Sequence, residues 1–494
     1  MIRLPANGPQ YGTATTKRVL FGHLQTEDAA SAVARRLRTA IGIGVLSAGE
    51  KLPREVDLAK QLGVTAFSLR EGLGILRSEG LIVTRVGKNG GSYVAQPPTG
   101  ESMAGEELVR LSATELRDLG DWRSALTTYA ARLSARRAPR STGDLLATYV
   151  EEMIAADSSA GARRALGRFQ VELSAGAQSM RLTRAELAAH EEFDWLVQVL
   201  LQDDAQRRAV ATRMRAIAIA VGAGDELSTW HTGEQLVSYQ VTELMRTRLQ
   251  TIAARSRSGL TEQDHVGDLA AELRSILGRT VQTLEGIAAE LSVFLERLPT
   301  AQELNAEVAR RVLPQLADLS EVVYGLGFMA EVGILPEAPY WMEWWQRAAD
   351  GAFDRDYTHQ LDSSRDDFYD YGIKDYLTQP RLTGEPSVIG PYVDHGGVGE
   401  TIITVSVPVT RVDDEAERGF AGIMAADLRI ATLERALSPW LATAERDCVV
   451  LNADRRVLLS NSAQYNAGDL LPTDTHLRLT DIGCFGWWLG QSAH

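Results

Sequence analysis

The spacing of apolar residues near the start of the chain predicts three short helices and a hairpin. Apolar side chains recur every three or four residues, as on one face of a helix, in three successive segments: Val33, Leu37 and Ile41; Leu58 and Leu62; Leu69, Leu73 and Leu76. Gly63 suits the left-handed position after the second helix, and Thr65 can cap the third. Two apolar runs, 81–85 and 92–95, flank the glycine-rich turn 87–91, as in a β-hairpin. This order of elements is that of a winged helix-turn-helix.

Helical spacing also dominates residues 105–255, where turn signals are few. One amphipathic stripe contains Leu116, Leu119, Trp122, Leu126, Tyr129 and Leu133, and similar stripes recur at 145–153 and 196–210. Helices with one apolar face must bury it against one another, so we expect a helical bundle. The polar run SRSGLTEQDHV at 256–266 is the candidate boundary that ends this bundle.

The C-terminal part has a different pattern. A long helix is predicted over 269–298, and from Val322 onward strands, aromatic residues and glycines alternate. Residues 401–409 and 419–428 are predicted to pair as an antiparallel hairpin, and 449–451 with 457–460 as a smaller one. Trp341, Trp344 and Trp345, spaced i, i+3 and i+4, are interpreted as the core of a helix.

The fold class is therefore α+β and multidomain. We expect a winged helix-turn-helix at 26–98, an all-α bundle at 105–255, and an antiparallel sheet domain preceded by a long helix at 265–494. A chain of 494 residues has room for about three domains.

The two ends of the chain carry opposite charge. Residues 1–98 contain 13 Lys and Arg against 7 Asp and Glu, a net charge of +6. Because the whole chain carries −14, the remaining residues carry −20. A basic head on an acidic body fits a polyanion such as nucleic acid at one end only.

Several classes of protein lack support in the sequence. The start of the chain has no basic-then-apolar signal, and no apolar run approaches the roughly 18 residues that span a bilayer, so we expect a cytoplasmic protein without a membrane partner. The two cysteines lack CxxC spacing. The chain contains no GxSxG, HExxH, phosphate loop or glycine-rich dinucleotide motif. We therefore predict that it is not an enzyme and has no cofactor.

The N-terminal module resembles the DNA-binding domain of the GntR family. The run IGIGVLSAGEKLPREVDLAKQLGVTAFSLREGLGILRSEGLIVTRVGKNGGSYV matches the family's G-x-L-x-x-G-x-x-L-P, L-A-x-x-L-G-V-[ST] and R-E-x-L-x-x-L-x-x-x-G-L positions. The resemblance implies a homodimer that reads a short palindromic operator, with the third helix in the major groove and the wing at the minor groove. The expected DNA-binding residues are Arg54, Thr65, Phe67, Ser68, Arg70, Lys88, Asn89 and Gly90.

Two positions of this module depart from the family. Arginine is often found where this chain has Val56 and Ala66, and arginine is the usual reader of guanine. The operator sequence is therefore left open. Phe67 can pack on a thymine methyl group or can be a surface aromatic.

The middle of the chain, especially DWRSALTTYAARLSARRA, resembles an FCD-type effector domain. In that family an aspartate and three histidines on neighbouring helices often hold a metal. This chain has Phe169-Gln170 where the family has Phe-His, and His190, His231 and His265 do not show the family's spacing. We predict no metal, interpret each histidine as a surface or core residue, and assign the bundle to dimerisation and signal relay.

The C-terminal part resembles a Cache sensor domain of the double type, which gives the expected sheet a Cache/PAS-like fold. The segments that carry the resemblance are VVYGLGFMAEVGIL, YWMEWWQRA, DDFYDYGIKDYLTQPRLTGEPSVIGPYVD, TIITVSVPV and GFAGIMAADL. In amino-acid-binding Cache domains, aromatic residues and an arginine hold the carboxylate, and a tyrosine with two aspartates holds the ammonium. The matching positions here are Tyr369, Lys374, Tyr376 and Leu377, then Tyr392, Asp394 and Asp427. Lysine replaces the arginine and leucine replaces an aromatic wall.

Together these features predict a ligand-responsive transcriptional regulator, expected to be a repressor. Its partners would be operator DNA, a second copy of the chain, and a small amine, amino acid or small carboxylate. Two alternatives stay open: a regulator fused to a pyridoxal-phosphate aminotransferase-like body, and a DNA-binding architectural protein without a ligand. The tyrosines of the candidate pocket can also be core residues with satisfied hydroxyls.

Overall fold

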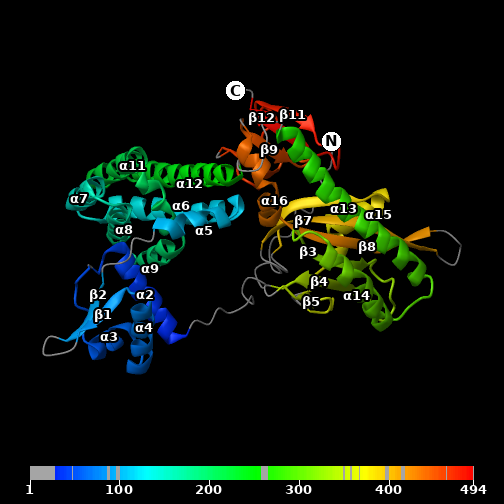
Figure 1. Cartoon of the computed structure of the whole chain (residues 1–494), viewed down its shortest axis with the longest axis horizontal. Coiled ribbons are helices and arrows are strands. Elements are labelled where there is room, and N and C mark those ends of the chain that lie inside the picture. The colour runs from blue at the N-terminus through cyan, green and yellow to red at the C-terminus, as the bar shows by residue number, and fades with distance from the viewer. Residues whose placement is uncertain are drawn as a thin grey trace. The chain divides into compact units, whose positions relative to one another are not determined.

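The computed structural model of the chain (Figure 1) describes residues 28–46, 48–85, 90–95, 101–256, 265–348, 351–355, 359–365, 368–394, 400–412, 418–444, 446–462 and 464–492. The chain divides into two compact units: residues 25–111 and 115–251 form one, and residues 252–494 form most of the other. Together the two units contain helices and antiparallel sheets, so the chain is an α+β multidomain protein.

The first unit begins with the predicted winged helix-turn-helix. Its elements are α2 (Ala29–Ile43), α3 (Glu55–Leu62), α4 (Ala66–Ser78), β1 (Ile82–Arg85) and β2 (Gly91–Val94). Gly63 ends α3 with φ 70°, and the Thr65 hydroxyl accepts a hydrogen bond from Ser68 N at 3.1 Å at the start of α4, as predicted. A Cβ at Gly72 would lie 2.7 Å from Ala30 O, so only glycine lets α2 and α4 approach this closely.

The rest of the first unit is helical. Its elements are α5 (Glu101–Arg110), α6 (Ala113–Arg137), α7 (Ser141–Ala155), α8 (Ser159–Gly176), α9 (Met180–Ala189), the π-helical turn η1 (His190–Asp194), α10 (Trp195–Val197), the 3-10 turn η2 (Leu200–Gln202), α11 (Asp204–Ala223) and α12 (Glu226–Ser256).

Two of the predicted stripes in this region were wrong in detail. On α6, Leu116 and Leu133 are buried as predicted, but Leu119, Trp122 and Leu126 are half-buried and Tyr129 is 47% exposed. The buried face also holds Arg123, Thr127, Ala130, Ala131 and Ser134. The buried face is offset because small and polar residues, including a paired arginine, occupy it. The stripe predicted at 196–210 is divided among α10, η2 and α11, because Asp203 caps a new helix by accepting from Gln206 N at 2.8 Å.

The second unit is built on a six-stranded antiparallel sheet with the order β5-β4-β3-β8-β7-β6. The strands are β3 (Val323–Ala330), β4 (Met342–Arg347), β5 (Phe353–Arg355), β6 (Ser387–Val393), β7 (Thr401–Val412) and β8 (Arg418–Arg429). The central pair β7 and β8 is the hairpin predicted from the sequence. Its charged turn, 413–417, lies outside the described residues.

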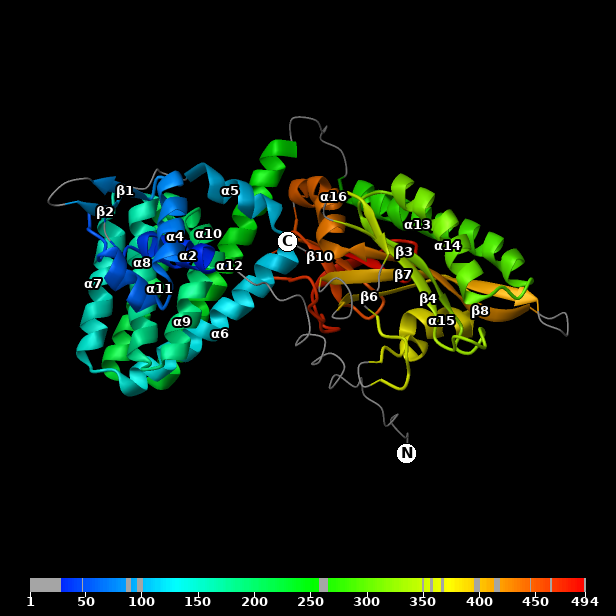
Figure 2. The same cartoon turned by 90° about the horizontal axis from the view of Figure 1, so that it is seen from below.

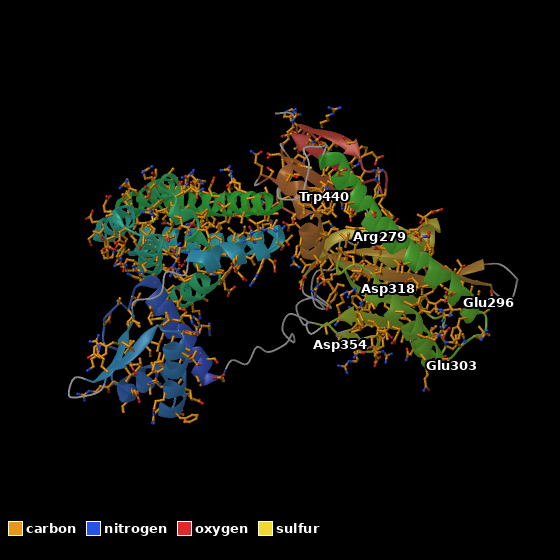
Figure 3. All side chains as sticks on the ribbon, viewed as in Figure 1. Arg279, Glu296, Glu303, Asp318, Asp354 and Trp440 are labelled. Atoms are coloured by element: carbon orange, nitrogen blue, oxygen red, sulfur yellow. The ribbon has the colours of Figure 1, made fainter. Side chains whose placement is uncertain are left out.

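Helices cover both faces of this sheet (Figure 2). The helices α13 (His265–Leu295), α14 (Ala301–Asp318) and α16 (Ile430–Thr443) pack on one face with the main apolar core. Exposed charged residues such as Arg279 and Glu303 mark the outer sides of α13 and α14 (Figure 3). The 3-10 turn η3 (Tyr371–Ile373) and α15 (Asp375–Thr383) belong to a smaller cluster on the other face.

A second, four-stranded antiparallel sheet completes the unit, with the order β10-β9-β12-β11. Its strands are β9 (Cys448–Leu451), β10 (Val457–Ser460), β11 (Leu477–Asp481) and β12 (Trp488–Ser492). The smaller predicted hairpin, β9 with β10, is confirmed. Among the described residues, no helix is both long and apolar enough to cross a bilayer.

The prediction of a helix for the tryptophan cluster was wrong. Trp344 and Trp345 lie in strand β4, and Trp341 immediately precedes it. Alternation along a strand sends these neighbours to opposite faces: Trp341 packs in the core against Phe328, with ring centroids 5.9 Å apart, whereas Trp344 belongs to the cluster under α15.

Candidate DNA-binding face and ligand pocket

The third helix of the winged module presents polar and apolar side chains to solvent. Arg70 is 65% exposed at its side chain, with Glu55 3.6 Å away, and Phe67 is 69% exposed. Thr65 and Ser68 lie at the start of the helix with their hydroxyl oxygens 3.0 Å apart, because both take part in the cap. Arg54 is exposed at the start of α3. These positions agree with a helix that offers its outer face to DNA.

The wing contains three further residues that were expected to bind DNA, and the structure describes one of them. Gly90 precedes β2, while Lys88 and Asn89, also expected to bind DNA, lie outside the described residues. The sequence reasoning missed Arg85, whose guanidinium lies 4.5 Å from the centre of the Tyr93 ring on the neighbouring strand. Its signal was an exposed position next to the wing turn. Val56 on α3 is 76% exposed, so the module also carries apolar groups on its surface.

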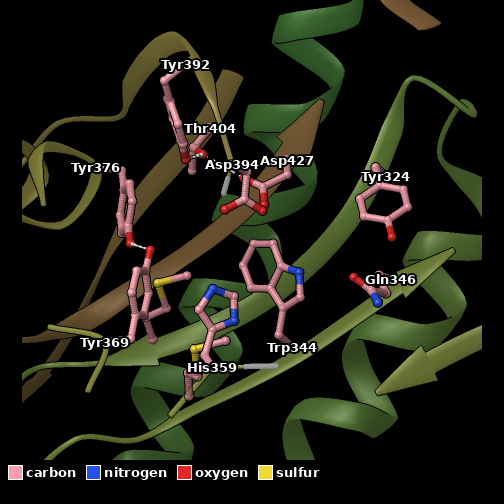
Figure 4. A pocket seen from close by; sticks show the side chains of 12 residues that line it. Tyr324, Trp344, Gln346, His359, Tyr369, Tyr376, Tyr392, Asp394, Thr404 and Asp427 are labelled. Atoms are coloured by element: carbon pink, nitrogen blue, oxygen red, sulfur yellow. Dashed lines mark hydrogen bonds between the residues drawn. The ribbon is translucent and has the colours of Figure 1, made fainter. Parts of the chain in front are cut away.

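A pocket lies on the α15 side of the six-stranded sheet (Figure 4). The space between its walls is about 410 Å³, including its mouth toward solvent. Its lining residues are Tyr324, Met329, Met342, Trp344, Gln346, His359, Tyr369, Tyr376, Tyr392, Asp394, Thr404 and Asp427. Two carboxylates and five aromatic rings besides His359 therefore surround one space, and this set contains no lysine or arginine.

Strand register explains why distant residues meet there. Asp427 on β8 lies opposite Gly325 on β3 and opposite Thr404 on β7, so the three share one face of the sheet. Trp344 fills the space above β3: a Cβ at Gly325 would lie 2.6 Å from Trp344 Nε1, and a Cβ at Gly327 would lie 2.6 Å from Trp344 Cε3. The two glycines thus let the indole lie close to the strand beside the aspartates (Figure 4).

A chain of hydrogen bonds fixes the proton positions near Asp427. The Thr404 hydroxyl donates to Asp427 Oδ1 at 2.6 Å, and its oxygen lies 2.6 Å from the Tyr392 hydroxyl. Because threonine has one hydroxyl proton, Tyr392 donates its own proton to Thr404. The remaining lone pairs of the Tyr392 oxygen make it an acceptor. Burial, and then the charge of Asp427, raise the pKa of Tyr392 well above its ordinary value, so it stays protonated.

Aromatic side chains form the wall opposite the aspartates. The hydroxyls of Tyr369 and Tyr376 are 2.5 Å apart, and the rings of His359 and Tyr369 have centroids 4.4 Å apart. Burial raises the pKa of Tyr376 well above its ordinary value, with the nearby Tyr369 adding to the shift. Tyr376 therefore stays protonated over the physiological range.

The structure brings together five of the six expected ligand residues: Tyr369, Tyr376, Tyr392, Asp394 and Asp427. The sixth, Lys374, is not among the lining residues. It precedes α15, its side chain is exposed, and its Nζ lies 5.7 Å from the centre of the Tyr369 ring. Sequence reasoning missed Thr404, Gln346 and His359, and discarded Trp344 with its cluster. The signal for Thr404 was its register opposite Asp427, which depends on the pairing of β7 with β8.

The first unit contains a separate buried polar group. Glu186, His190 and Asp194 are each at most 5% exposed, and each offers an atom of a type that binds metals, all within 4.8 Å of one another. Burial alone would raise the pKa of Asp194, but Arg123 and His190 lower it below the usual value. His231, in contrast, is exposed. His190 is thus a core histidine and His231 a surface one.

The fold of residues 29–94 defines a class, the winged helix-turn-helix DNA-binding proteins. The same residues match the family described as bacterial regulatory proteins, gntR family. The chain is 32% identical over 221 residues to the HTH-type transcriptional regulator Rv0494 of Mycobacterium tuberculosis, a match that covers 44% of this chain and 89% of that protein. The chain therefore belongs to the gntR family of bacterial regulatory proteins.

Other matches cover smaller parts or are more distant. The HTH-type transcriptional regulator RmpR of Mycobacterium gastri is 35% identical over 174 residues, 35% of this chain and 64% of that protein, so the chain spans less than two thirds of its length. These relatives are transcriptional regulators by name, which confirms the prediction that the chain is not an enzyme. The extracellular domain of the histidine kinase soHK1S-Z6 matches 50% of this chain and 94% of its own, with 16% identity and a TM-score of 0.33. A TM-score of this size supports no conclusion about fold or ligand.

Proposed function

We propose that this regulator binds operator DNA as a homodimer and responds to a small organic amine or amino acid held in the pocket of the second unit, a Cache-type sensor. The observation that carries the proposal is the placement of Asp394 and Asp427 in one pocket with Trp344 and four tyrosines. A buried cation needs paired negative charge, and aromatic faces attract cations. This pocket supplies both.

The arrangement favours the ammonium end of such a ligand over a carboxylate. Lysine and arginine are missing from the described lining, while Tyr392 presents acceptor lone pairs beside two acidic groups. A carboxylate without an ammonium would meet like charge there. We therefore infer that the ammonium is the group recognised first, and that Lys374 can meet a ligand carboxylate only outside the described pocket.

A thermal-shift screen of the full-length protein tests the proposal. Monoamines, polyamines, quaternary amines, amino acids and small carboxylates are compared, and a ligand at a hundredfold excess over its Kd adds about 2.7 kcal/mol of stability. Asp427→Asn should abolish the shift of the amine that raises Tm most. Asp354→Asn, an exposed carboxylate of the same unit, should leave it unchanged. A response to carboxylates alone would contradict ammonium recognition.

Regulation requires more than binding. A ligand changes DNA occupancy only if it favours one arrangement of the dimer over another. We propose repression that the amine relieves, so the amine should weaken binding to the protein's own promoter region. Light scattering that reports a monomer with full operator affinity would contradict the dimer, and an amine that leaves operator binding unchanged would contradict the sensing role.

The same preparations separate the two alternatives. An aminotransferase-like body would carry pyridoxal, whose Schiff base absorbs near 400 nm, whereas the proposed sensor would not absorb there. An architectural protein would bind DNA with the same affinity in every ligand of the screen.

A further inference from the structure

The helical part of the first unit contains charged side chains that neither the DNA-binding face nor the pocket uses. Arg123 on α6 is completely buried, and its Nη1 donates to Glu186 Oε1 at 2.7 Å. Arg123 Nε lies 3.4 Å from Asp194 Oδ1. The guanidinium therefore lies between two carboxylates that come from α9 and the π-helical turn η1.

The π-helical turn gathers potential metal ligands around this point. π-Helical turns are rare in proteins, and those that occur are frequently found at functional sites. In η1, His190 Nδ1 pairs with the Asp194 carboxylate, and His190 Nε2 lies 3.5 Å from Glu186 Oε1. One histidine and two carboxylates are a set that Zn²⁺ and similar ions accept.

A buried amide lies on the neighbouring helix without a partner. Gln170 on α8 is 1% exposed, and neither its amide oxygen nor its amide nitrogen has a hydrogen-bond partner among the described residues. One turn before it, a Cβ at Gly167 would lie 3.1 Å from His190 Cε1; one turn after it, Ser174 Oγ donates to Glu186 at 3.3 Å. Gln170 therefore lies on the face of α8 that carries both contacts.

The FCD-type domains that this part of the chain resembles often hold a metal, but Arg123 makes the residues present here a poor fit for one. A metal ion binds carboxylate oxygens at about 2.0–2.2 Å, which would bring it beside a guanidinium that is always charged. Because the group is buried, bulk water cannot screen that repulsion. The Arg123 guanidinium already supplies the positive charge that a metal ion would bring to Glu186 and Asp194.

We propose that the Arg123 guanidinium is a built-in cation that replaces a metal ion in this domain, and that its removal leaves a latent divalent-metal site formed by Glu186, His190 and Asp194. In the natural protein the bundle then needs no metal to hold its two carboxylates. Without the guanidinium, the same carboxylates and His190 are left buried with unbalanced charge, which a divalent ion can neutralise.

The full-length protein and its Arg123→Ala variant test this with Zn²⁺. After dialysis the natural protein should retain no stoichiometric zinc, and neither EDTA nor Zn²⁺ should move its Tm. Arg123→Ala should melt lower, bind about one Zn²⁺ per chain, and gain about 5 °C or more at a hundredfold excess over Kd. Adding Gln170→His to this variant should tighten binding about tenfold, because it supplies a further ligand on the facing helix.

Two control variants locate the effect. Arg123→Ala with His190→Ala should lose the zinc response, and Arg137→Ala, which removes another α6 arginine, should never gain it. Refolding of Arg123→Ala only when Zn²⁺ is present gives the same support as a higher Tm. The proposal is overturned if the natural protein binds one Zn²⁺ that His190→Ala abolishes, or if Zn²⁺ neither stabilises nor refolds Arg123→Ala.

Discussion

Thr404 on β7 lies directly opposite Asp427 on β8, and its hydroxyl joins the Asp427 carboxylate to the Tyr392 hydroxyl through two hydrogen bonds of 2.6 Å. The three residues lie on three different strands: Tyr392 on β6, Thr404 on β7 and Asp427 on β8. The register between β7 and β8 places the uncharged Thr404 where its hydroxyl orients both the Asp427 carboxylate and the Tyr392 hydroxyl.

Thr404→Val should weaken amine binding about tenfold, or about 1.4 kcal/mol. Valine keeps the shape of the side chain but removes the donor to Asp427 and the acceptor for Tyr392, so both groups lose their orientation. Titration calorimetry with the amine that raises Tm most measures the change. Thr404→Ser keeps the hydroxyl and should bind within about twofold of the natural protein; equal loss in both variants would show that the methyl group matters instead.

Arg70→Ala should weaken binding to the promoter region and lower the slope of log affinity against log salt by about one. The side chain is largely exposed on the outer face of α4, so its loss should leave the fold intact. Fluorescence anisotropy over a range of salt gives both quantities. Arg297→Ala, an exposed arginine outside the winged module, is the matched control. An unchanged slope in Arg70→Ala would remove Arg70 from the DNA contacts.

Phe67 should read thymine methyl groups. Its ring, on α4, is 69% exposed, and apolar side chains contact thymine through the C5-methyl group. Operators in which deoxyuridine replaces thymidine lack that methyl, and they should bind the natural protein about fivefold more weakly, or about 1 kcal/mol. Phe67→Ala should bind both operators alike. A full loss on deoxyuridine DNA in Phe67→Ala would assign the methyl contact to another residue.

Gly327→Ala should destabilise the second unit and prevent amine binding. The added Cβ would lie 2.6 Å from the Trp344 ring, and overpacking of this kind costs about 1–3 kcal/mol. A lower Tm together with the loss of the ligand-induced shift is the expected result. Gly419→Ala adds a Cβ that meets no atom within 4 Å and should change neither quantity.

Local spacing in the sequence was sufficient for elements that form through short-range contacts. The caps at Thr65 and Gly63 involve residues within one turn, and the β7–β8 hairpin joins segments next to each other in the chain. Residues that bury through distant partners were not predictable in this way. Arg123 occupies the buried face of α6 because Glu186 and Asp194, more than sixty residues away, pair with it.

The pocket shows the same division. Two aspartates and three tyrosines could be matched to a known pattern, but Thr404 depends on a register between strands, and Trp344 depends on glycines in β3 that no local pattern connects to it. The spacing of three tryptophans at i, i+3 and i+4 fits one face of a helix. The same spacing is also compatible with a strand, in which Trp341 and Trp345 lie on one face and Trp344 lies on the other. Pairing with a neighbouring strand decides between the helix and the strand.

The alternation along β8 has a mechanical consequence. Asp427 lies on the pocket face, while its neighbours Ala426 and Leu428 are completely buried in the core that contains α13. Only the backbone of β8 thus separates Asp427, the proposed ligand contact, from side chains in the core that contains α13. A ligand that twists β8 by a few degrees must also shift side chains against α13, so binding and the strain on that helix are a single equilibrium rather than two successive events.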